Sequence, residues 1–341
     1  MIIVHVESGL GNQMLNYAEL LALKKVNPKQ DIYIENCIYD ISNKFDVGIK
    51  QWNGYELETV FGIKEKNIKD VVNYDEFLSY VIQTKFWENG WNFSENICKS
   101  LLKVGIQVEN KVSYNSLFKM SNREKIIRKI IFETRLGNYF YRLYSRLFET
   151  KLIKDNSNIL FSKVDGNAYF GQELKFYYKG YGIEKIEDEL KEFFSFKNIS
   201  LDKQNQEILN MENETNSVSI HVRRGDFKTN YYCYKYGYFK RAVKLIRKKI
   251  YNPTFYIFTD PMSVDWCKKN LKILGLKESD KIVFVNHNKS DKSYVDLFLM
   301  SRCKHNIITR SSFGWWASFL NPNVNKITIS PDFKFNTKYW R

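Results

Sequence analysis

A group of polar residues follows a short β-branched run in the C-terminal half of the chain. The run at 217–222 alternates like a buried strand, and it ends directly before Arg223, Arg224 and Asp226. Alternation places His221 and Arg223 on one side of this strand. A guanidinium offers a planar fork of donors that fits a phosphate or a carboxylate. The run therefore predicts an anion site, and a salt bridge that only holds the loop is an equal alternative for Arg224 and Asp226.

Two glycines near the N-terminus bring backbone amides close to one another. Gly9, Gly11 and Asn12 connect a β-branched run at 1–6 with a helical stretch at 13–25. The N-terminus of a helix attracts anions because its first amides have no partner within the helix. The spacing matches neither a Walker A loop nor a dinucleotide fingerprint. A tight strand-to-helix connection stays the alternative to an anion site.

A third stretch repeats this arrangement near the C-terminus. Ser311, Ser312 and Phe313 follow a predicted strand and precede a helix. Hydroxyls and helix-terminal amides again meet where an anion can bind. The next two aromatic residues, Trp315 and Trp316, are expected to pack the helix on the sheet rather than stack on a ligand.

The sequence carries no recognisable metal motif. It has no Asp-x-Asp pair, no His-Glu-x-x-His and no cluster of His and Cys. His5, His287 and His305 are each expected to be structural or surface residues rather than ligands. Arginine and helix N-termini would then meet the charge of a bound phosphate. This combination is typical of a metal-independent enzyme that uses a nucleotide diphosphate donor.

Composition narrows the class of protein. The chain has 341 residues, 53 of them basic and 38 acidic, for a formal charge of +15, and 44% of it is hydrophobic. A disordered tail and a small disulfide scaffold are excluded, and the length suits two domains. A basic surface attracts nucleic acid, anionic lipid or a phosphorylated small molecule, unless its lysines are merely solvated. Dispersed lysines without a nucleic-acid motif argue against nucleic acid as the partner.

Cysteine usage and the lack of long apolar runs predict a cytoplasmic protein. The five cysteines are far apart and odd in number, which argues against a disulfide framework. The N-terminal run includes a histidine and an acid where a signal peptide has its apolar core. No apolar run reaches the length of about 18 residues that a membrane-spanning helix needs.

Short β-branched runs alternate with helical stretches, which predicts an α/β protein with parallel sheets covered on both faces. We expect one domain at 1–205 and a second at 206–341. The elements predicted are strands at 1–6, 217–222, 254–258, 281–285, 306–309 and 326–330, and helices at 13–25, 238–249 and 294–303.

The segment at about 121–154 has a composition of its own. Nine basic residues oppose three glutamates there, a net charge of +6 in 34 residues. Its apolar residues recur at helical spacing, so the segment is amphipathic. We interpret it as a basic helical insertion in the first domain. Its apolar face either packs on the core or lies on an anionic membrane surface.

Four motifs occur in one order from the first predicted strand to the last. They are Gly-Leu-Gly-Asn-Gln-Met at 9–14, His-Val-Arg-Arg-Gly-Asp at 221–226, Phe-Thr-Asp at 258–260 with Trp266, and Ser-Ser-Phe-Gly-Trp-Trp-Ala at 311–317. Together they resemble the bacterial α-1,2-fucosyltransferases of glycosyltransferase family 11. The resemblance implies a GT-B-like fold of two facing Rossmann-like domains, with GDP-β-L-fucose held mainly by the C-terminal one.

The resemblance also implies roles around the donor's phosphates. Arg223 would hold the β-phosphate and stabilise the charge on the leaving GDP, with Arg224 beside it. Gly11 and Asn12 would face the same pyrophosphate from the other domain. Asp226 would orient the arginines.

Further residues would complete the donor site. By the resemblance, His221 and Asp296 would contact the nucleoside, and Ser311 and Ser312 would donate to phosphate oxygens beside Phe313. Many family members have serine where this chain has Gly314. Residues 30–165 match the family little, and acceptor recognition is expected there.

An inverting transfer needs a base for the acceptor hydroxyl, and the sequence identifies none. Glu173 and Asp226 are candidates, and a departing phosphate oxygen that takes the proton is an alternative.

The resulting hypothesis is an inverting, metal-independent fucosyltransferase without a cofactor. It would move L-fucose from GDP-β-L-fucose to a hydroxyl, O2, of a galactose-like residue in an O-antigen or capsule precursor. The oligosaccharide acceptor would be free or lipid-linked, and the enzyme cytoplasmic, with peripheral contact to the inner face of the cytoplasmic membrane as an option. The alternatives are another donor or linkage on the same fold, such as α-1,3-fucosyl transfer, and a basic phosphate- or nucleic-acid-binding module.

Overall fold

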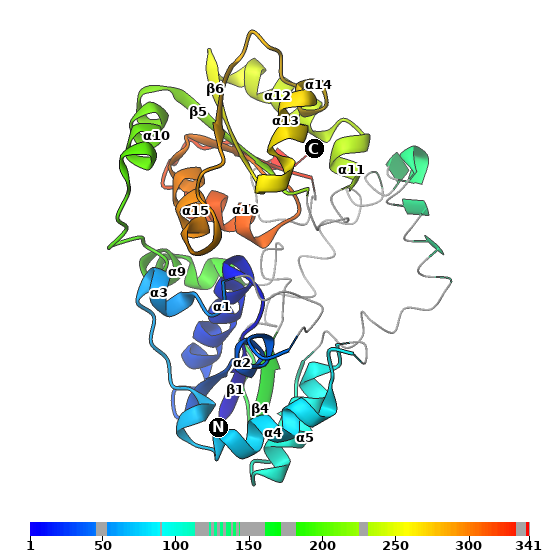
Figure 1. Cartoon of the computed structure of the whole chain (residues 1–341), viewed down its shortest axis with the longest axis vertical. Helices are drawn as coiled ribbons and strands as arrows, with labels where there is room; N and C mark the ends of the chain where they lie inside the picture. The colour runs from blue at the N-terminus through cyan, green and yellow to red at the C-terminus, as the bar shows by residue number, and fades with distance from the viewer. Residues whose placement is uncertain are drawn as a thin grey trace. The chain divides into compact units, whose positions relative to one another are not determined.

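The structure is a computed structural model, and within the residues it describes the chain belongs to the α/β class, as predicted (Figure 1). It divides into two compact units, the first made of Met1–Arg123 and Ile153–Phe193 and the second of Glu124–Leu152 and Phe194–Arg341. The predicted boundary between 205 and 206 lies inside helix α10 (Lys203–Glu214) of the second unit. The described residues are 1–45, 53–88, 91–112, 161–171, 182–224, 231–331, 339–340 and scattered positions between 123 and 143.

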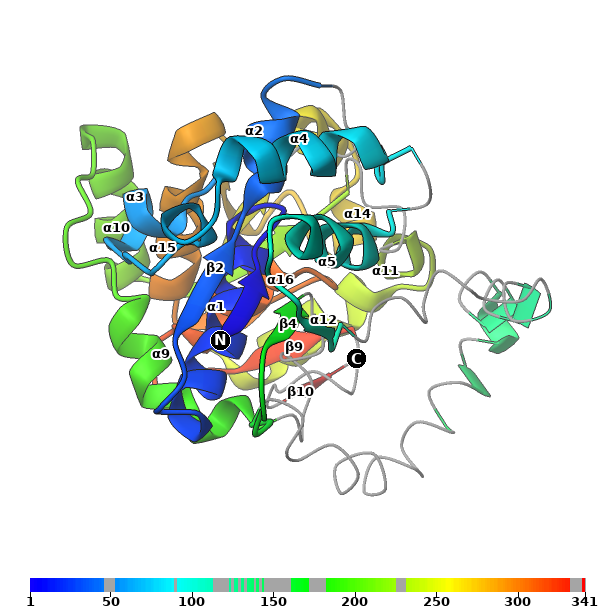
Figure 2. The ribbon, with the colours of Figure 1, turned by 90° about the horizontal axis from the view of Figure 1, so that it is seen from below.

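The first unit contains a parallel sheet of four strands in the order β2-β1-β4-β3 (Figure 2). Strand β1 pairs with β2 on one side and with β4 on the other, so that His5 lies opposite both Glu35 and Gly171. Its β-branched residues are fully buried, which explains the run predicted at 1–6. The strands are β1 (Ile2–His5), β2 (Ile32–Glu35), β3 (Glu109–Asn110) and β4 (Ala168–Gly171).

Helices cover this sheet and bury its two faces. Successive strand residues point to opposite faces, and Ile3 and Tyr169 pack into a core with Phe77, Phe93 and Ile97 from α4 and α5. The helices of the unit are α1 (Leu10–Val26), α2 (Cys37–Ser42), α3 (Leu57–Phe61), η1 (Ile68–Asp70), α4 (Tyr74–Thr84), α5 (Phe93–Lys103), η2 (Ile183–Ile186) and α9 (Glu187–Phe193).

The second unit contains a parallel sheet of six strands in the order β10-β9-β8-β5-β6-β7. The chain starts at the centre with β5, adds β6 and β7 on one side, and then crosses to β8, β9 and β10 on the other. This is the strand order of dinucleotide-binding doubly wound sheets, whose ligands bind where the order reverses. The strands are β5 (Asn216–Val222), β6 (Pro253–Thr259), β7 (Lys281–Val285), β8 (His305–Ile307), β9 (Thr328–Ser330) and β10 (Tyr339–Trp340).

Helices lie on both faces of this sheet, with α10, α15 and α16 on one side and α12, α13 and α14 on the other (Figure 1). The six predicted strands and three predicted helices are confirmed, with small shifts at their ends. The helices that follow α10 are α11 (Tyr231–Lys235), α12 (Tyr238–Lys249), η4 (Pro261–Ser263), α13 (Val264–Lys269), α14 (Leu271–Leu274), η5 (Ser290–Lys292), α15 (Ser293–Arg302) and α16 (Ser312–Phe319).

Two further expectations concern the membrane and the thiols. Most of the predicted insertion at 121–154 lies outside the described residues. Among the residues that are described, no helix is long and apolar enough to cross a membrane. All five cysteines are free thiols.

Gly171 permits the close approach of β4 to β1. It has φ +149°, and a Cβ at this position would lie 2.5 Å from the Cβ of His5. Gly171→Ala is therefore expected to lower the free energy of unfolding by about 1–3 kcal/mol more than Gly166→Ala, because the new methyl group overpacks the site. Gly166 is the matched control, since it also has positive φ (+89°) but open space around it. Urea unfolding of both variants measures the difference, and equal midpoints would contradict the clash.

Candidate functional site

The strand order of the second unit reverses between β5 and β8, and the residues predicted to bind an anion lie at that edge. Arg223 directly follows β5, and two side chains hold the turn that carries it. The Tyr234 hydroxyl donates to the Arg223 carbonyl at 2.7 Å, and the Thr259 hydroxyl donates to the Val222 carbonyl at 2.8 Å. The half-buried side chain of Arg223 is thus placed at the edge where ligands of such sheets bind.

His221 precedes Arg223 on the same side of β5 and is 6% exposed. Burial, together with the charge of Arg223, lowers the pKa of His221 to about 3, so the imidazole is neutral at physiological pH. The ring lies directly against α16, where a Cβ on Gly314 would come within 2.4 Å of its Nδ1 atom. The absence of a Cβ at Gly314 therefore makes room for the ring of His221.

Of the two polar residues that follow Arg223 in the predicted site, the structure describes Arg224 but not Asp226. The guanidinium of Arg224 lies 4.4 Å from the centroid of the Trp266 ring, in a cation–π contact that joins the turn after β5 to α13. Because the side chain is exposed and stacked, it supports the turn beside Arg223. Asp226 lies outside the described residues, so its predicted role stays a prediction.

The N-terminus of α16 closes the same edge from the neighbouring strand. Ser311 is the N-cap residue, and its amide donates to the Thr309 carbonyl at 2.9 Å. Ser312 and Phe313 begin the helix, and the Phe313 ring lies 6.0 Å from that of His221. The first turn of α16 thus lies against His221 at the end of β5, and the predicted donation of Ser311 and Ser312 to phosphate oxygens stays a prediction.

The tryptophan pair of α16 is fully buried, which confirms its structural role. Trp315 stacks on Phe319 with ring centroids 4.9 Å apart, and Trp316 packs edge-on against Phe194 at 5.0 Å. The helix is therefore anchored by aromatic contacts, and its first turn has a fixed position.

Asp296 lies on α15, in a polar network rather than against His221. The Asn288 side chain donates to it at 2.7 Å, and Asn288 in turn bonds to Asn205 of α10. Burial raises the pKa of Asp296 to about 7. The predicted contact with a nucleoside stays a prediction.

In the first unit, hydrogen bonds with neighbouring loop residues hold the glycine turn that precedes α1. The Gln13 side chain donates to the carbonyls of Ser8 and Gly54, each at 2.8 Å, and accepts from the Glu56 amide at 2.8 Å. The Glu56 carboxyl accepts from the Leu10 amide at the start of α1, and burial raises its pKa. A carboxylate of the chain itself thus occupies part of this helix N-terminus. The approach of Gly11 and Asn12 to a pyrophosphate stays a prediction.

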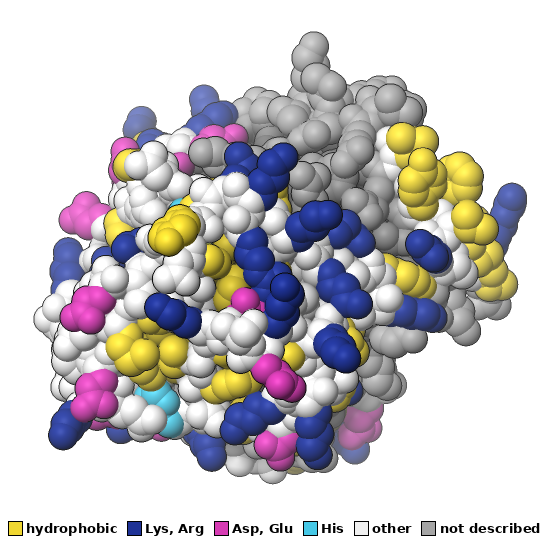
Figure 3. Space-filling view, turned by 90° about the horizontal axis from the view of Figure 1, so that it is seen from above, with side chains coloured by type: hydrophobic (Ala, Val, Ile, Leu, Met, Phe, Trp, Pro, Cys, Tyr) yellow, Lys and Arg dark blue, Asp and Glu magenta, His cyan; other side chains and the backbone are white. Residues whose placement is uncertain are grey.

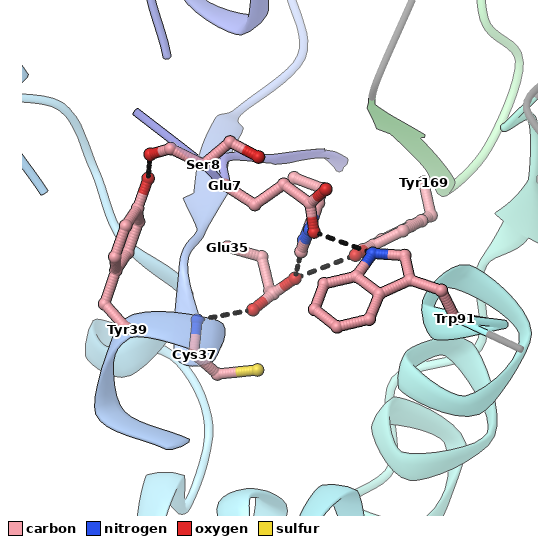
Figure 4. Close-up of polar contacts among 8 residues, drawn as sticks. Glu7, Ser8, Glu35, Cys37, Tyr39, Trp91 and Tyr169 are labelled. Atoms are coloured by element: carbon pink, nitrogen blue, oxygen red, sulfur yellow. Dashed lines mark hydrogen bonds and ion pairs between the residues drawn. The ribbon is translucent and has the colours of Figure 1, made fainter. Parts of the chain in front are cut away.

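Beside this turn lies a buried charged cluster that the sequence analysis did not identify as a site (Figure 4). His5, fully buried at the end of β1, donates through Nδ1 to Glu35 at 2.6 Å and through Nε2 to Glu7 at 3.1 Å. Its ring stacks on Phe93 with centroids 4.3 Å apart. Burial alone would lower the pKa of His5, but the charges and hydrogen bonds of the two glutamates raise it to about 9. His5 is therefore an imidazolium held between carboxylates.

Glu35 is saturated with donors. Its Oε2 atom also accepts from the Tyr169 hydroxyl at 2.8 Å, and its Oε1 atom accepts from the Cys37 amide at 2.7 Å. Burial would raise its pKa, but the charge and hydrogen bond of His5, with the Cys37 amide, lower it to about 2. Glu35 is fully buried, so its role is to hold His5 in place.

Glu7 has a different environment. Its Oε2 atom accepts from His5 and from the Trp91 indole at 3.2 Å, whereas Oε1 has no hydrogen-bond partner among the described residues. The Glu7 side chain keeps 7% of its surface exposed. Its Oε1 atom is not among the fully buried side-chain atoms that lack a hydrogen-bond partner. The next residue, Ser8, has φ 67°, and its carbonyl accepts from the hydroxyl of Tyr39 at 2.8 Å as well as from Gln13.

The sequence did contain a signal for this cluster. His5 and Glu7 lie two residues apart at the end of an apolar strand, and Glu35 ends the second apolar strand, Ile-Tyr-Ile-Glu. Charged residues at the carboxyl ends of two parallel strands meet at one edge. Trp91 and Tyr169 had no such signal, since they come from distant segments without a distinctive pattern.

The sequence pattern of the family described as "Glycosyl transferase family 11" matches residues 142–338. An α-1,2-colitosyltransferase of Escherichia coli is 30% identical over 230 residues, which are 65% of this chain and 74% of that one. The O-antigen biosynthesis glycosyltransferase WbnK of Escherichia coli is 30% identical over 144 residues, 37% of this chain and 45% of that one.

A bovine galactoside 2-α-L-fucosyltransferase, SEC1, is 30% identical over 109 residues, 30% of this chain and 28% of that one. Among solved structures, fucosyltransferase NodZ from Bradyrhizobium aligns over 94% of this chain and 92% of its own, with 13% identity and a TM-score of 0.41.

Gly314→Ala tests whether the position of His221 matters for ligand binding. The new Cβ would lie 2.4 Å from the His221 ring, so the ring must shift. We expect GDP affinity to fall roughly 5- to 100-fold, in line with the usual cost of overpacking. Alanine favours a helix over glycine, so a general effect on α16 would be stabilising instead. Calorimetric titration measures binding, and His221→Ala/Gly314→Ala should lose less affinity than the sum of the single changes. An unchanged affinity in Gly314→Ala would contradict the prediction.

Proposed function

The chain belongs to glycosyl transferase family 11, and from this premise we propose that it transfers L-fucose from GDP-β-L-fucose to a hydroxyl of a glycan. The observation that supports the donor site is the reversal of strand order in the second unit. Arg223 and the N-terminus of α16 lie together at that edge, which suits an anionic ligand.

The side chains at this edge of the second sheet have different roles in donor binding. Arg223 binds the β-phosphate and stabilises the negative charge that grows on GDP as it leaves. His221 stays neutral, so it contributes a polar contact without a second positive charge. Arg224 stacks on Trp266 and keeps the turn in place. Arginine and helix amides meet the phosphate charge, so the transfer is proposed to proceed without a metal ion or cofactor.

The transfer is proposed to invert the configuration at the anomeric carbon. The acceptor oxygen forms a bond to this carbon while the bond to the GDP oxygen breaks, and its electron pair stays on GDP. The acceptor hydroxyl loses its proton in the same process. A β-linked donor then gives an α-linked product.

The acceptor is proposed to be a galactose-like residue of an O-antigen or capsule precursor, modified at O2. The relatives named above support this choice, because one forms α-1,2 linkages and another acts in O-antigen biosynthesis. A specific second candidate is a colitosyl donor, since the first relative is a colitosyltransferase. Colitose is L-fucose without its 3-hydroxyl, so both donors present the same phosphates to Arg223.

Adjacent arginines provide a test of the donor site. Arg223→Ala is expected to lower turnover of GDP-fucose by roughly 100-fold or more, because one donor to the developing charge is lost. Arg224→Ala should lose roughly tenfold or less, because its guanidinium rests on Trp266. Fucosyl transfer to a panel of galactosides with EDTA present measures both variants.

The same assay discriminates between the candidate functions. Transfer from GDP-colitose but not from GDP-fucose would show that the proposed donor is wrong and that the colitosyl donor is correct. A product without an O2 linkage would contradict the proposed linkage. Equal losses in the two arginine variants would contradict the role of Arg223. No transfer and no GDP release by the wild type would contradict the proposed function.

We further propose that the segment at 121–154 brings the enzyme to an anionic membrane that carries a lipid-linked acceptor. Hydrophobic side chains gather beside Lys and Arg at the right of Figure 3. Seven of the described apolar residues of this segment are 45–71% exposed, and they are Ile126, Ile127, Ile130, Leu136, Tyr139, Phe140 and Leu143. Ile131 is partly buried. Apolar residues next to basic ones are typical of peripheral contact with anionic lipid.

Vesicle flotation tests this contact. The protein is expected to float with vesicles of phosphatidylglycerol and phosphatidylcholine at low salt, and to remain in solution with phosphatidylcholine alone. Ile126→Ser/Ile130→Ser should reduce the bound fraction severalfold. Val324→Ser is the matched control, because this valine is apolar and 91% exposed but belongs to another surface. Equal binding by the two variants would contradict a role for the segment.

A further inference from the structure

We infer that Glu7 is the base that removes the proton from the acceptor hydroxyl. The inference rests on the proposed function, because such a transfer needs a proton acceptor. The two carboxylates that the sequence offered, Glu173 and Asp226, lie outside the described residues. Among the described residues, Glu7 combines a position at a ligand-binding edge with a fixed geometry and an available oxygen.

The position of Glu7 follows from the topology of the first sheet. Strand β1 lies between β2, which follows it in the chain, and β4, which comes much later. The strand order therefore reverses beside β1, and ligands of open α/β sheets bind outside the carboxyl ends of strands at such a point. Glu7 comes two residues after the end of β1, and Gly171 ends β4 at the same edge.

In Glu7, one carboxylate oxygen, Oε2, accepts two hydrogen bonds, whereas the other, Oε1, accepts none from the described residues. His5 and the Trp91 indole both donate to Oε2, at 3.1 and 3.2 Å. The residue is only 5% exposed, yet Oε1 has no partner among the described residues and is not sealed. A purely structural carboxylate has its oxygens occupied, as in Glu35. The unoccupied oxygen of Glu7 is therefore available to an acceptor hydroxyl.

The backbone around Glu7 carries local strain. Ser8 has φ 67° and Trp91 has φ 58°, a left-handed conformation that is unfavourable for a residue with a side chain. Hydrogen bonds from Gln13 and Tyr39 hold the Ser8 carbonyl in this conformation. Strained positions persist where the surroundings fix them and gather at functional sites. Both strained residues adjoin or contact Glu7.

The other ionisable groups of the cluster are accounted for by their own partners. His5 is protonated, and Glu35 is ionised and fully supplied with donors, so these two groups neutralise each other. The ionisable groups around them, Cys37, Tyr39 and Tyr169, are neutral because burial raises their pKa values. Glu7 is thus the carboxylate of this cluster that keeps an oxygen without a partner among the described residues.

The complete step balances in atoms and charge. The acceptor oxygen forms its bond to the anomeric carbon as GDP departs with the electron pair of the broken bond. The hydroxyl proton passes to Oε1 of Glu7, which becomes a neutral carboxylic acid. The acid returns the proton to water after the product leaves.

The test uses Glu7→Gln and Glu7→Ala with GDP-fucose and a galactoside acceptor. Glutamine keeps the hydrogen-bond acceptor for His5 and Trp91 but cannot take a proton, so kcat is expected to fall roughly 100- to 10,000-fold. GDP binding should stay within about twofold, because the predicted donor site lies in the other unit. Glu19→Gln on α1 is the matched control, a buried glutamate outside the cluster whose loss should leave kcat unchanged.

Azide provides the decisive measurement, because this anion attacks the sugar without losing a proton. In Glu7→Ala, sodium azide is expected to restore consumption of GDP-fucose and to yield α-fucosyl azide. Glu35→Ala removes the other glutamate of the cluster and should gain nothing from azide, since its defect would be structural. The proposal is overturned if Glu7→Gln keeps near-normal kcat, or if azide rescues both alanine variants or neither.

A failure of the proposed function can be distinguished from a failure of the role of Glu7. In that case the wild-type protein neither transfers fucose nor releases GDP, whatever residue stands at position 7. Wild-type transfer combined with active Glu7 variants would reject Glu7 alone. Thermal unfolding of each variant shows whether a loss of activity reflects a loss of fold.

Discussion

The buried pair of His5 and Glu35 is the interaction on which the first unit depends. Two charges removed from water are costly unless each is paired and hydrogen-bonded. Here parallel strands place the residues opposite each other, and Tyr169 and the Cys37 amide supply the remaining donors. The pair therefore fixes the ends of β1, β2 and β4 together. The turn that follows β1, with Glu7 on it, starts from this fixed point.

In the second unit, aromatic and backbone contacts, rather than buried charges, hold the ends of the strands together. The Tyr238 hydroxyl donates to the carbonyls of Ile308 and Ile329, and so links the ends of neighbouring strands. His221 is buried without a carboxylate partner, which is why its pKa falls where that of His5 rises. Two histidines at the ends of central strands thus have opposite protonation states. The cause is the presence or absence of a glutamate on the adjacent strand.

Sequence patterns predicted the second unit better than the first for physical reasons. Most of its strands are rich in β-branched residues and bounded by clear turn residues, and Arg223 stands directly after β5. A helix was also expected after Ser311 and Ser312, with Trp315 and Trp316 packed on the sheet. Parallel pairing alone brings the residues that follow these strands to one edge, so their meeting there could be expected without knowledge of the sheet order.

The first unit was less predictable because its site is assembled from distant segments. Strand β4 reads Ala-Tyr-Phe-Gly and has no β-branched residue, and neither it nor β2 was predicted. Trp91 reaches Glu7 from a turn before α5, and no spacing rule connects residues so far apart. The stacking of Arg224 on Trp266 was equally hidden, since a cation–π contact leaves no pattern in the sequence.

The two edges carry charge of opposite sign, and this difference matches the two halves of a glycosyl transfer. The edge of the first unit has the carboxylates of Glu7, Glu35 and Glu56 against one imidazolium. The edge of the second unit has two arginines beside a neutral histidine. A departing diphosphate needs positive charge, whereas a hydroxyl that loses its proton needs a negative acceptor. Under the proposed function, the edge of the second unit suits the departing diphosphate, and the edge of the first unit suits the hydroxyl that loses its proton.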